Sequence, residues 1–183
     1  MSKFKLFIVA LLVSTGGFLV NIYQHRPERG PKLVRVTADV SVTSQLKPAN
    51  VRWLRREGTR TLIDIRPDGE ASDQAPSSEI KSAAERSGLR FHYIPVPHES
   101  IPKDAVEALG RALSTEATPA VLYCRTGRRA VRLFALVQAS RADGPDAEAI
   151  LKMVQATGFS ADDLKGEIEQ RLLQRQSTSA ETE

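Results

Sequence analysis

The sequence predicts an α/β fold in which a central, mostly parallel sheet carries helices on both faces. Short apolar runs alternate along the chain with longer helical patterns, an order typical of parallel sheets. The chain has 183 residues, of which 41% are hydrophobic, enough for one domain and an appendage. In its second half a buried-strand pattern, Ala120–Tyr123, leads into a cysteine, a glycine-containing turn and a helical pattern.

The appendage is at the N-terminus, where we expect a transmembrane helix. Leu6–Tyr23 is an uncharged run of 18 residues preceded by Lys3 and Lys5, and this length can span a bilayer. The alternative is a signal peptide, but no convincing cleavage site follows the run. We therefore predict a single-pass membrane anchor in residues 1–23, of which residues 4–23 would contact the membrane. Basic residues lie on both sides of the run, at Lys3 and Lys5 before it and at Arg26, Arg29, Lys32 and Arg35 after it, so the positive-inside rule is divided. Short N-terminal anchors with a basic start usually keep the N-terminus in the cytoplasm, so the domain is expected to be extracytoplasmic.

After a polar linker over residues 24–32, the domain is expected to occupy residues 33–175. Alternating apolar and polar residues predict its first strands. Ser77 or Ser78 can cap the start of a helix. Gly58 and Gly88 are suited to the ends of two helices. The elements predicted in this half are one or two edge strands within 33–43, a helix over 47–57, a strand over 61–65, a helix over 77–87 and a strand over 91–96.

The second half continues the alternation and then becomes helical. The predicted elements are a helix over 104–113, a strand over 120–123 and helices over 130–139, 146–156 and 160–175. The polar residues 176–183 predict a disordered tail. Ligands of such folds bind beyond the carboxyl ends of the strands, so we expect the loops that contain Asp68, His98–Glu99 and Cys124 to meet there.

The turn after the 120–123 strand is the one place where the sequence predicts chemistry. Backbone N–H groups of a tight turn and of the following helix start converge on one point and favour an anion there. Cys124 opens this turn, so its thiolate should be stabilised, as a nucleophile requires. Arg125, Arg128, Arg129 and Arg132 crowd the same turn, and residues 117–142 contain no Asp or Glu that could neutralise them.

Two simpler interpretations compete with this one. A lone cysteine at a strand end is often a small buried hydrophobe, and arginine runs usually form a solvated face. Neither explains why the thiol, the glycine and the arginines fall together at a strand-to-helix turn. We therefore favour an anion-binding loop that carries a thiolate.

Composition excludes several other classes of function. The formal net charge of +4 is too small, and too poorly accompanied by aromatic residues, to indicate a nucleic-acid partner. The single cysteine excludes an intramolecular disulfide and a cysteine-rich metal site. His25, His92 and His98 are too scattered to suggest zinc. We expect no metal and no cofactor, and a phosphorylated or other small anionic substrate. The oligomeric state stays open.

Four short segments of the chain carry a family resemblance. They are Thr61–Glu70 (TLIDIRPDGE), Pro76–Glu79 (PSSE), Tyr93–Val96 (YIPV) and Tyr123–Arg129 (YCRTGRR). Together they resemble the phosphatase-like domain of bacterial beta-lactamase-hydrolase-like proteins, a family related to the dual-specificity and tyrosine protein phosphatases. The resemblance covers roughly residues 33–151 and implies a cysteine-phosphatase-like fold.

The same resemblance implies roles for the loop. Cys124 would be the nucleophile and Arg129 would bind phosphate, within a phosphate loop formed by Arg125, Thr126, Gly127, Arg128 and Ala130. Cysteine phosphatases usually have five residues between the cysteine and the arginine, whereas this chain has four, a spacing shared with rhodaneses. Ala130 also lacks the hydroxyl that follows the arginine in most phosphatases.

The general acid that protonates the leaving group is not fixed by the sequence. His98 and Glu99 follow the strand where related phosphatases place their acid, and Asp68 can reach in from a neighbouring loop. Asp68 could instead shape its own Pro-Asp-Gly turn, and Asp64 is expected to be structural. Arg66 could be an additional anion ligand or an ion-pair partner.

Three functions therefore remain open. The first is a membrane-anchored phosphatase that acts through a phosphocysteine at Cys124. The second is a sulfurtransferase that carries a persulfide on the same sulfur, favoured by the four-residue spacing. The third is an anion-binding module without catalysis, favoured by Ala130. All three share the predicted fold, so the fold cannot decide between them.

Overall fold

The computed structural model describes residues 30–180, with side chains described to residue 177. The predicted membrane anchor lies outside the described residues. Within residues 30–180, no helix has both the length and the apolar character needed to cross a bilayer. The account that follows concerns the compact unit that begins at Pro31.

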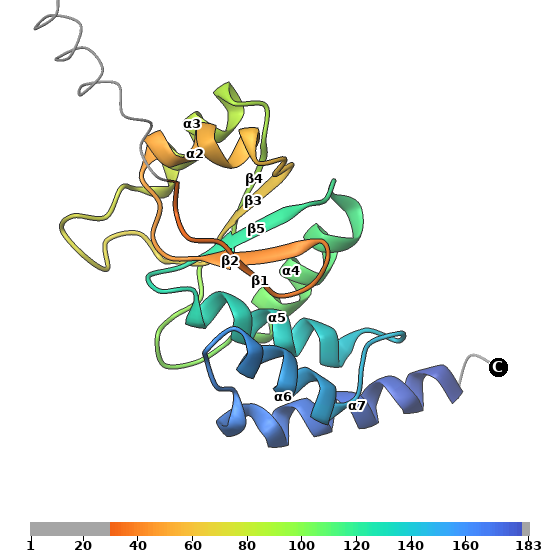
Figure 1. Ribbon diagram of the computed structural model, residues 1–183. Helices are drawn as coiled ribbons and strands as arrows, with labels where there is room; N and C mark the ends of the chain where they lie inside the picture. Colours follow the sequence, from red (N-terminus) through yellow and green to blue (C-terminus); the bar gives the residue numbers. More distant parts are fainter. Residues whose placement is uncertain (1–29, 181–183) are drawn as a thin grey trace, which may run out of the picture. The chain divides into compact units, whose positions relative to one another are not determined.

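A five-stranded sheet forms the centre of this unit, with the strand order β1-β2-β5-β3-β4 (Figure 1). The strands are β1 (Val34–Arg35), β2 (Val40–Thr43), β3 (Thr61–Asp64), β4 (Arg90–Tyr93) and β5 (Ala120–Tyr123). β1 pairs antiparallel with β2, and the other pairings are parallel. The register places Asp64 of β3 opposite Tyr123 of β5. The predicted α/β fold with a mostly parallel sheet is therefore confirmed.

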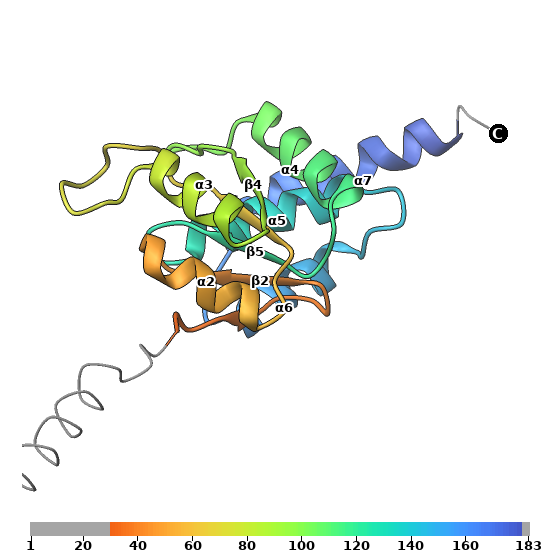
Figure 2. The same cartoon turned by 90° about the horizontal axis from the view of Figure 1, so that it is seen from above.

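Helices cover the sheet on both faces (Figures 1 and 2). One face carries α2 (Pro48–Arg56) and α3 (Ser77–Arg86). The other carries α4 (Lys103–Thr115), α5 (Arg128–Ser140), α6 (Ala147–Ala156), a short 3-10 helix η1 (Asp162–Leu164) and α7 (Lys165–Ala180). The side chains of a strand alternate between the faces, so β3 and β5 contribute residues to two cores.

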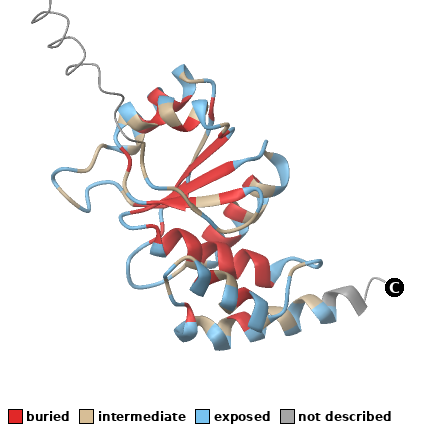
Figure 3. Ribbon diagram, viewed as in Figure 1, coloured by how far each residue is buried: buried red, intermediate tan, exposed pale blue. Residues whose placement is uncertain are grey.

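The two cores are visible as buried surface on either side of the strands (Figure 3). On the α2–α3 side, Leu62 and Val121 pack with Leu54 and Ile80. On the other side, strand residues pack against α4 and α5, and α5 is buried along most of its length. A helix enclosed in this way is held rigidly, which fixes the position of the loop at its N-terminus.

Three elements differ from the sequence-based predictions. β2 is an interior strand between β1 and β5, not an edge strand, because β1 covers its outer side. α5 begins at Arg128, two residues before the predicted start. α7 continues to Ala180, so residues 176–180, which we predicted as part of a disordered tail, are helical.

Candidate active site

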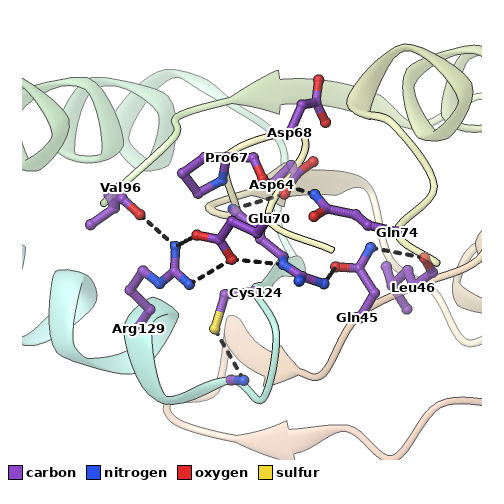
Figure 4. Close-up of polar contacts among 12 residues, drawn as sticks. Gln45, Leu46, Asp64, Pro67, Asp68, Glu70, Gln74, Val96, Cys124 and Arg129 are labelled. Carbon is purple, nitrogen blue, oxygen red and sulfur yellow. Dashed lines mark hydrogen bonds and ion pairs between the residues drawn. The ribbon is translucent and has the colours of Figure 1, made fainter. Parts of the chain in front are cut away.

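The turn between β5 and α5 wraps its backbone around the sulfur of Cys124. Cys124 is only 2% exposed, and the Gly127 N–H donates to its Sγ over 3.2 Å (Figure 4). An anionic sulfur accepts such a hydrogen bond better than a neutral thiol does. Gly127 has a φ of 97°, a conformation that glycine adopts without steric cost. The glycine therefore lets the turn direct its N–H at the sulfur.

Neighbouring segments hold this turn from outside. A Cβ on Gly127 would lie 3.4 Å from the Thr43 carbonyl oxygen and 3.5 Å from the Phe159 ring, so both residues pack closely against the turn. The Gln45 N–H donates to the Arg125 carbonyl over 3.3 Å. The loop is thus enclosed between the end of β2 and the segment before η1.

Arg129, in the first turn of α5, is clamped by two acceptors. Its Nη1 donates to the Glu70 Oε1 (2.7 Å) and to the Val96 carbonyl (2.6 Å), while its Nη2 donates to the Glu70 Oε2 (3.0 Å). Paired bonds of this kind fix the plane of the guanidinium. Figure 4 shows the Arg129 head group beside Cys124 and held by Glu70.

Glu70 is itself held by a second arginine. Its Oε2 accepts from the Arg66 Nε over 2.9 Å, and the Arg66 Nη1 donates to the Gln45 Oε1 over 2.8 Å. The hydrogen bonds from Arg129 and Arg66 lower the pKa of Glu70 from 4.5 to about 2, so it stays a carboxylate. Arg66, buried at 3% exposure, is therefore an ion-pair partner of Glu70.

The remaining arginines of the turn fall into two classes. Arg132 binds both carboxylate oxygens of Asp163, at 2.5 and 2.6 Å. Arg125 and Arg128 are exposed and form no ion pair within residues 30–177. The prediction that nothing neutralises the cluster is therefore wrong for Arg129 and Arg132. Their carboxylate partners come from segments distant in sequence, which the local absence of acids could not reveal.

A pocket of about 550 Å³ opens above Cys124. Three segments form its wall: the β4–α4 loop, the turn from Cys124 to Arg132, and the residues around η1. His98 and Glu99 line it from the first segment and are exposed. Glu99 lies near enough to Arg129 to help raise the pKa of that guanidinium. The pocket thus combines a sulfur, cationic groups and the side chains of His98 and Glu99.

Asp68 does not line this pocket. Its two carboxylate oxygens accept from the Ser77 N–H (2.7 Å) and the Ser77 hydroxyl (2.6 Å), and its own N–H donates to the Tyr93 hydroxyl over 2.9 Å. Asp68 therefore caps the start of α3, a role we had expected of Ser77 or Ser78. The loop that contains Asp68 does reach the site, but through Glu70.

Asp64 is the other unusual carboxyl group near the site. It is 1% exposed, and its Oδ1 accepts from the Arg66 N–H over 2.9 Å. Burial raises the pKa of Asp64 to about 6. Its hydrogen bond shapes the strand end that leads to Arg66 and Glu70, in keeping with the structural role that we expected.

Sequence analysis missed three carboxylates of this site. Glu70 is the last residue of Thr61–Glu70, one of the segments that carry the family resemblance. Its position in the sequence does not indicate that it contacts Arg129. Asp163 and Glu167 line the pocket from η1 and α7, about 40 residues beyond Cys124 in the chain, and no motif marks them. Within the described residues, no cluster of three His, Cys, Asp or Glu side chains could hold a metal ion.

Comparisons with known proteins place the chain among phosphatase-like proteins. The beta-lactamase hydrolase-like protein of Xylella fastidiosa (strain Temecula1) is 31% identical over 57% of this chain and 24% of its own length. The chain thus spans about a quarter of the length of the curated relatives that it matches.

Solved structures similar to this chain are also described as phosphatases. A candidate phosphatase from Neisseria meningitidis is 27% identical and has a TM-score of 0.66, covering 75% of this chain and 96% of that one. The catalytic core of a PP-IP phosphatase from S. cerevisiae shares the fold at 14% identity, with a TM-score of 0.59 over 77% and 86% of the two chains. The model for the phosphatase-like domain of beta-lactamase hydrolase-like proteins matches residues 32–141, more than half of the chain, which therefore belongs to that family.

Proposed function

We propose that the chain is a membrane-anchored, cysteine-dependent phosphatase that hydrolyses phosphate esters through a phosphocysteine at Cys124. The observation that carries this proposal is the placement of one sulfur at the pocket, with the Gly127 N–H donating to it and the Arg129 guanidinium beside it. This arrangement offers a nucleophile and donors for phosphate oxygens in one place.

The reaction would proceed in two steps. The Cys124 Sγ attacks phosphorus, an S–P bond forms, and the bond from phosphorus to the ester oxygen breaks. Glu99 or His98 donates a proton to the departing oxygen. Water then attacks the phosphocysteine, breaks the S–P bond and releases inorganic phosphate. Backbone N–H groups of the turn and Arg129 would bind the phosphoryl oxygens in both steps.

The anchor belongs to the same proposal. Leu6–Tyr23 is uncharged and long enough to span a bilayer, and short N-terminal anchors with a basic start usually keep the N-terminus in the cytoplasm, which would place the domain outside. If this is right, the full chain should remain in the membrane fraction after carbonate extraction. Release into the supernatant would contradict the anchor and would leave the chemistry of Cys124 unaffected.

A second candidate function is sulfur transfer. The four-residue spacing between Cys124 and Arg129 gives a smaller loop than most cysteine phosphatases have, and Ala130 supplies no hydroxyl. In this reaction the Cys124 sulfur attacks the sulfane sulfur of thiosulfate, which forms a persulfide and releases sulfite. Cyanide then accepts the sulfane sulfur as thiocyanate and restores the thiolate.

One experiment separates these functions. The full chain in detergent, as wild type and as Cys124→Ser, is assayed in parallel with p-nitrophenyl phosphate and with thiosulfate plus cyanide. We expect phosphate release from the wild type alone, and an acid-quenched sample heavier by one phosphoryl group. Thiocyanate without phosphate would establish the sulfurtransferase instead. Anion binding without either product would leave a non-catalytic module.

A further inference from the structure

A second positively charged site lies on the opposite face of the sheet from α5. Helices α2 and α3 pack side by side there (Figures 1 and 2), and an open groove of about 710 Å³ runs along them. Four arginines line this groove together with small and apolar residues, and none of its lining residues is acidic. The arginines are Arg52, Arg55, Arg56 and Arg86.

These arginines have no ion-pair partner within residues 30–177. Helix α2 contains no acidic residue, and Glu85 of α3 pairs with Lys81 one turn earlier. Arg55 reaches across to the end of α3, where its Nε lies 4.0 Å from the position that a Cβ on Gly88 would occupy. The charges therefore converge from two helices.

Helix dipoles account for only part of this arrangement. Arg55, Arg56 and Arg86 lie in the last turns of their helices, where a cation is favoured. Arg52 lies a turn earlier in α2 and shares a face with Arg55 and Arg56, because residues three and four apart are neighbours on a helix. Four unpaired guanidiniums in one groove repel one another, and an anionic ligand would offset this repulsion at closer range than dissolved salt does.

We propose that this groove binds the phosphate groups of an anionic phospholipid surface. The proposal rests on the membrane anchor of the proposed function. Residues 24–32 span at most about 30 Å when fully extended, so an anchored chain keeps lipid phosphates within reach. Leu33 packs against the core beneath α2 and α3, so it lies on the face of the sheet that carries this groove. The pairing of Val34 with Val42 places Leu33 toward the carboxyl ends of the parallel strands. Basic clusters beside a membrane segment attract anionic lipid.

Binding at the groove is compatible with catalysis. Helices α2 and α3 end just before β3 and β4 begin, so Arg55, Arg56 and Arg86 lie near the starts of the parallel strands. Cys124 follows the end of β5, at the opposite end of the parallel strands, and residues of α5, η1 and α7 on the other face of the sheet line the pocket above it. A lipid surface held at the groove would leave the pocket above Cys124 open to a substrate from solution.

The test compares the full chain in two kinds of lipid nanodisc by hydrogen exchange. One contains phosphatidylcholine alone, and the other also contains about 30% phosphatidylglycerol. We expect the amides of α2 and α3 to exchange at least about fivefold more slowly in the anionic discs. This protection should be lost in a variant that combines Arg52→Gln, Arg55→Gln, Arg56→Gln and Arg86→Gln. A control with the same charge change on the other face should keep it: Lys103→Gln, Arg111→Gln, Lys152→Gln and Lys165→Gln.

Each other outcome has a definite meaning. Equal exchange in the two discs, or equal loss in both variants, overturns the lipid site. Protection of α2 and α3 by a soluble phosphorylated peptide in neutral discs would assign the groove to a protein partner instead. Retention on neutral discs reports the anchor separately. A chain held only by anionic discs would contradict the anchor and support the groove, and a chain held by neither would contradict both.

Discussion

Glu70 and Arg129 form a two-pronged ion pair that joins the β3–α3 loop to the first turn of α5, with N···O distances of 2.7 and 3.0 Å. The Arg66 Nε donates a hydrogen bond to the Oε2 of the same carboxylate. The guanidinium beside Cys124 is therefore oriented by a residue 59 positions earlier in the chain. In this arrangement Glu70 positions Arg129 and is not among the residues that line the pocket above Cys124.

Replacing Glu70 by glutamine should lower activity strongly. The neutral amide has a single acceptor oxygen, so it cannot accept from both the Nη1 and the Nη2 of Arg129. The guanidinium loses its fixed plane, and we expect kcat/KM for an aryl phosphate to fall about 10- to 100-fold. Arg66 keeps a buried charge with a weaker partner, which should cost roughly 1–3 kcal/mol of unfolding free energy. Steady-state kinetics and urea unfolding measure the two effects.

The pH dependence of that stability loss is a further check on Glu70. Its pKa falls from 4.5 to about 2 on folding, so its contribution is present above pH 4.5 and is lost as the pH falls toward 2. The stability difference between wild type and Glu70→Gln should therefore shrink below pH 4.5. Glu79→Gln, an exposed residue in the first turn of α3, is the charge-matched control and should leave kcat/KM unchanged.

Asp64 should make the protein less stable as the pH rises. Its folded-state pKa of about 6 lies above its ordinary value of 3.8, so the folded state holds a proton that the unfolded state releases. Between pH 4 and pH 6 the wild type should lose about 2 kcal/mol of unfolding free energy through this group. Asp64→Asn should remove that loss, whereas the exposed Asp73→Asn should not. Parallel pH profiles for wild type and Asp64→Asn would contradict this account.

Gly127→Ala should weaken both the fold and the chemistry. A side chain at a φ of 97° costs about 1–2 kcal/mol, while the new Cβ would meet Thr43 and Phe159 at van der Waals distance. Relief of this strain would turn the N–H away from Cys124, so kcat should fall as well. Gly166→Ala in α7 has open space around it and should change stability by less than about 1 kcal/mol. Thermal unfolding and kinetics of both variants provide the measurement.

The leaving group should reveal which residue is the general acid. An acid matters most when the departing alkoxide is a poor leaving group. If Glu99 donates the proton, Glu99→Gln should slow phenyl phosphate at least about tenfold more than p-nitrophenyl phosphate. His98→Ala should then slow both substrates equally. The reverse pattern would assign the proton to His98, and no selectivity in either variant would exclude both.

The sequence located most elements because their signals are local. Ala120–Tyr123 was predicted as a buried strand and is β5, since a short apolar run flanked by turn residues has few other solutions. β2 was predicted at an edge, and only the pairing with β1 and β5 made it an interior strand. Strand order depends on contacts between distant segments, which periodicity does not encode.

The sequence by itself determined the loop that carries Cys124. A strand, a thiol, a glycine and a helix start are consecutive in the chain, so local geometry gathers them around one point. Tertiary structure alone decided which arginines of the loop are ion-paired with a carboxylate. Glu70 and Asp163 neutralise Arg129 and Arg132, and they reach them across 59 and 31 residues of chain. An ion pair depends on distance in space, and that distance is set only once the sheet and its helices have packed.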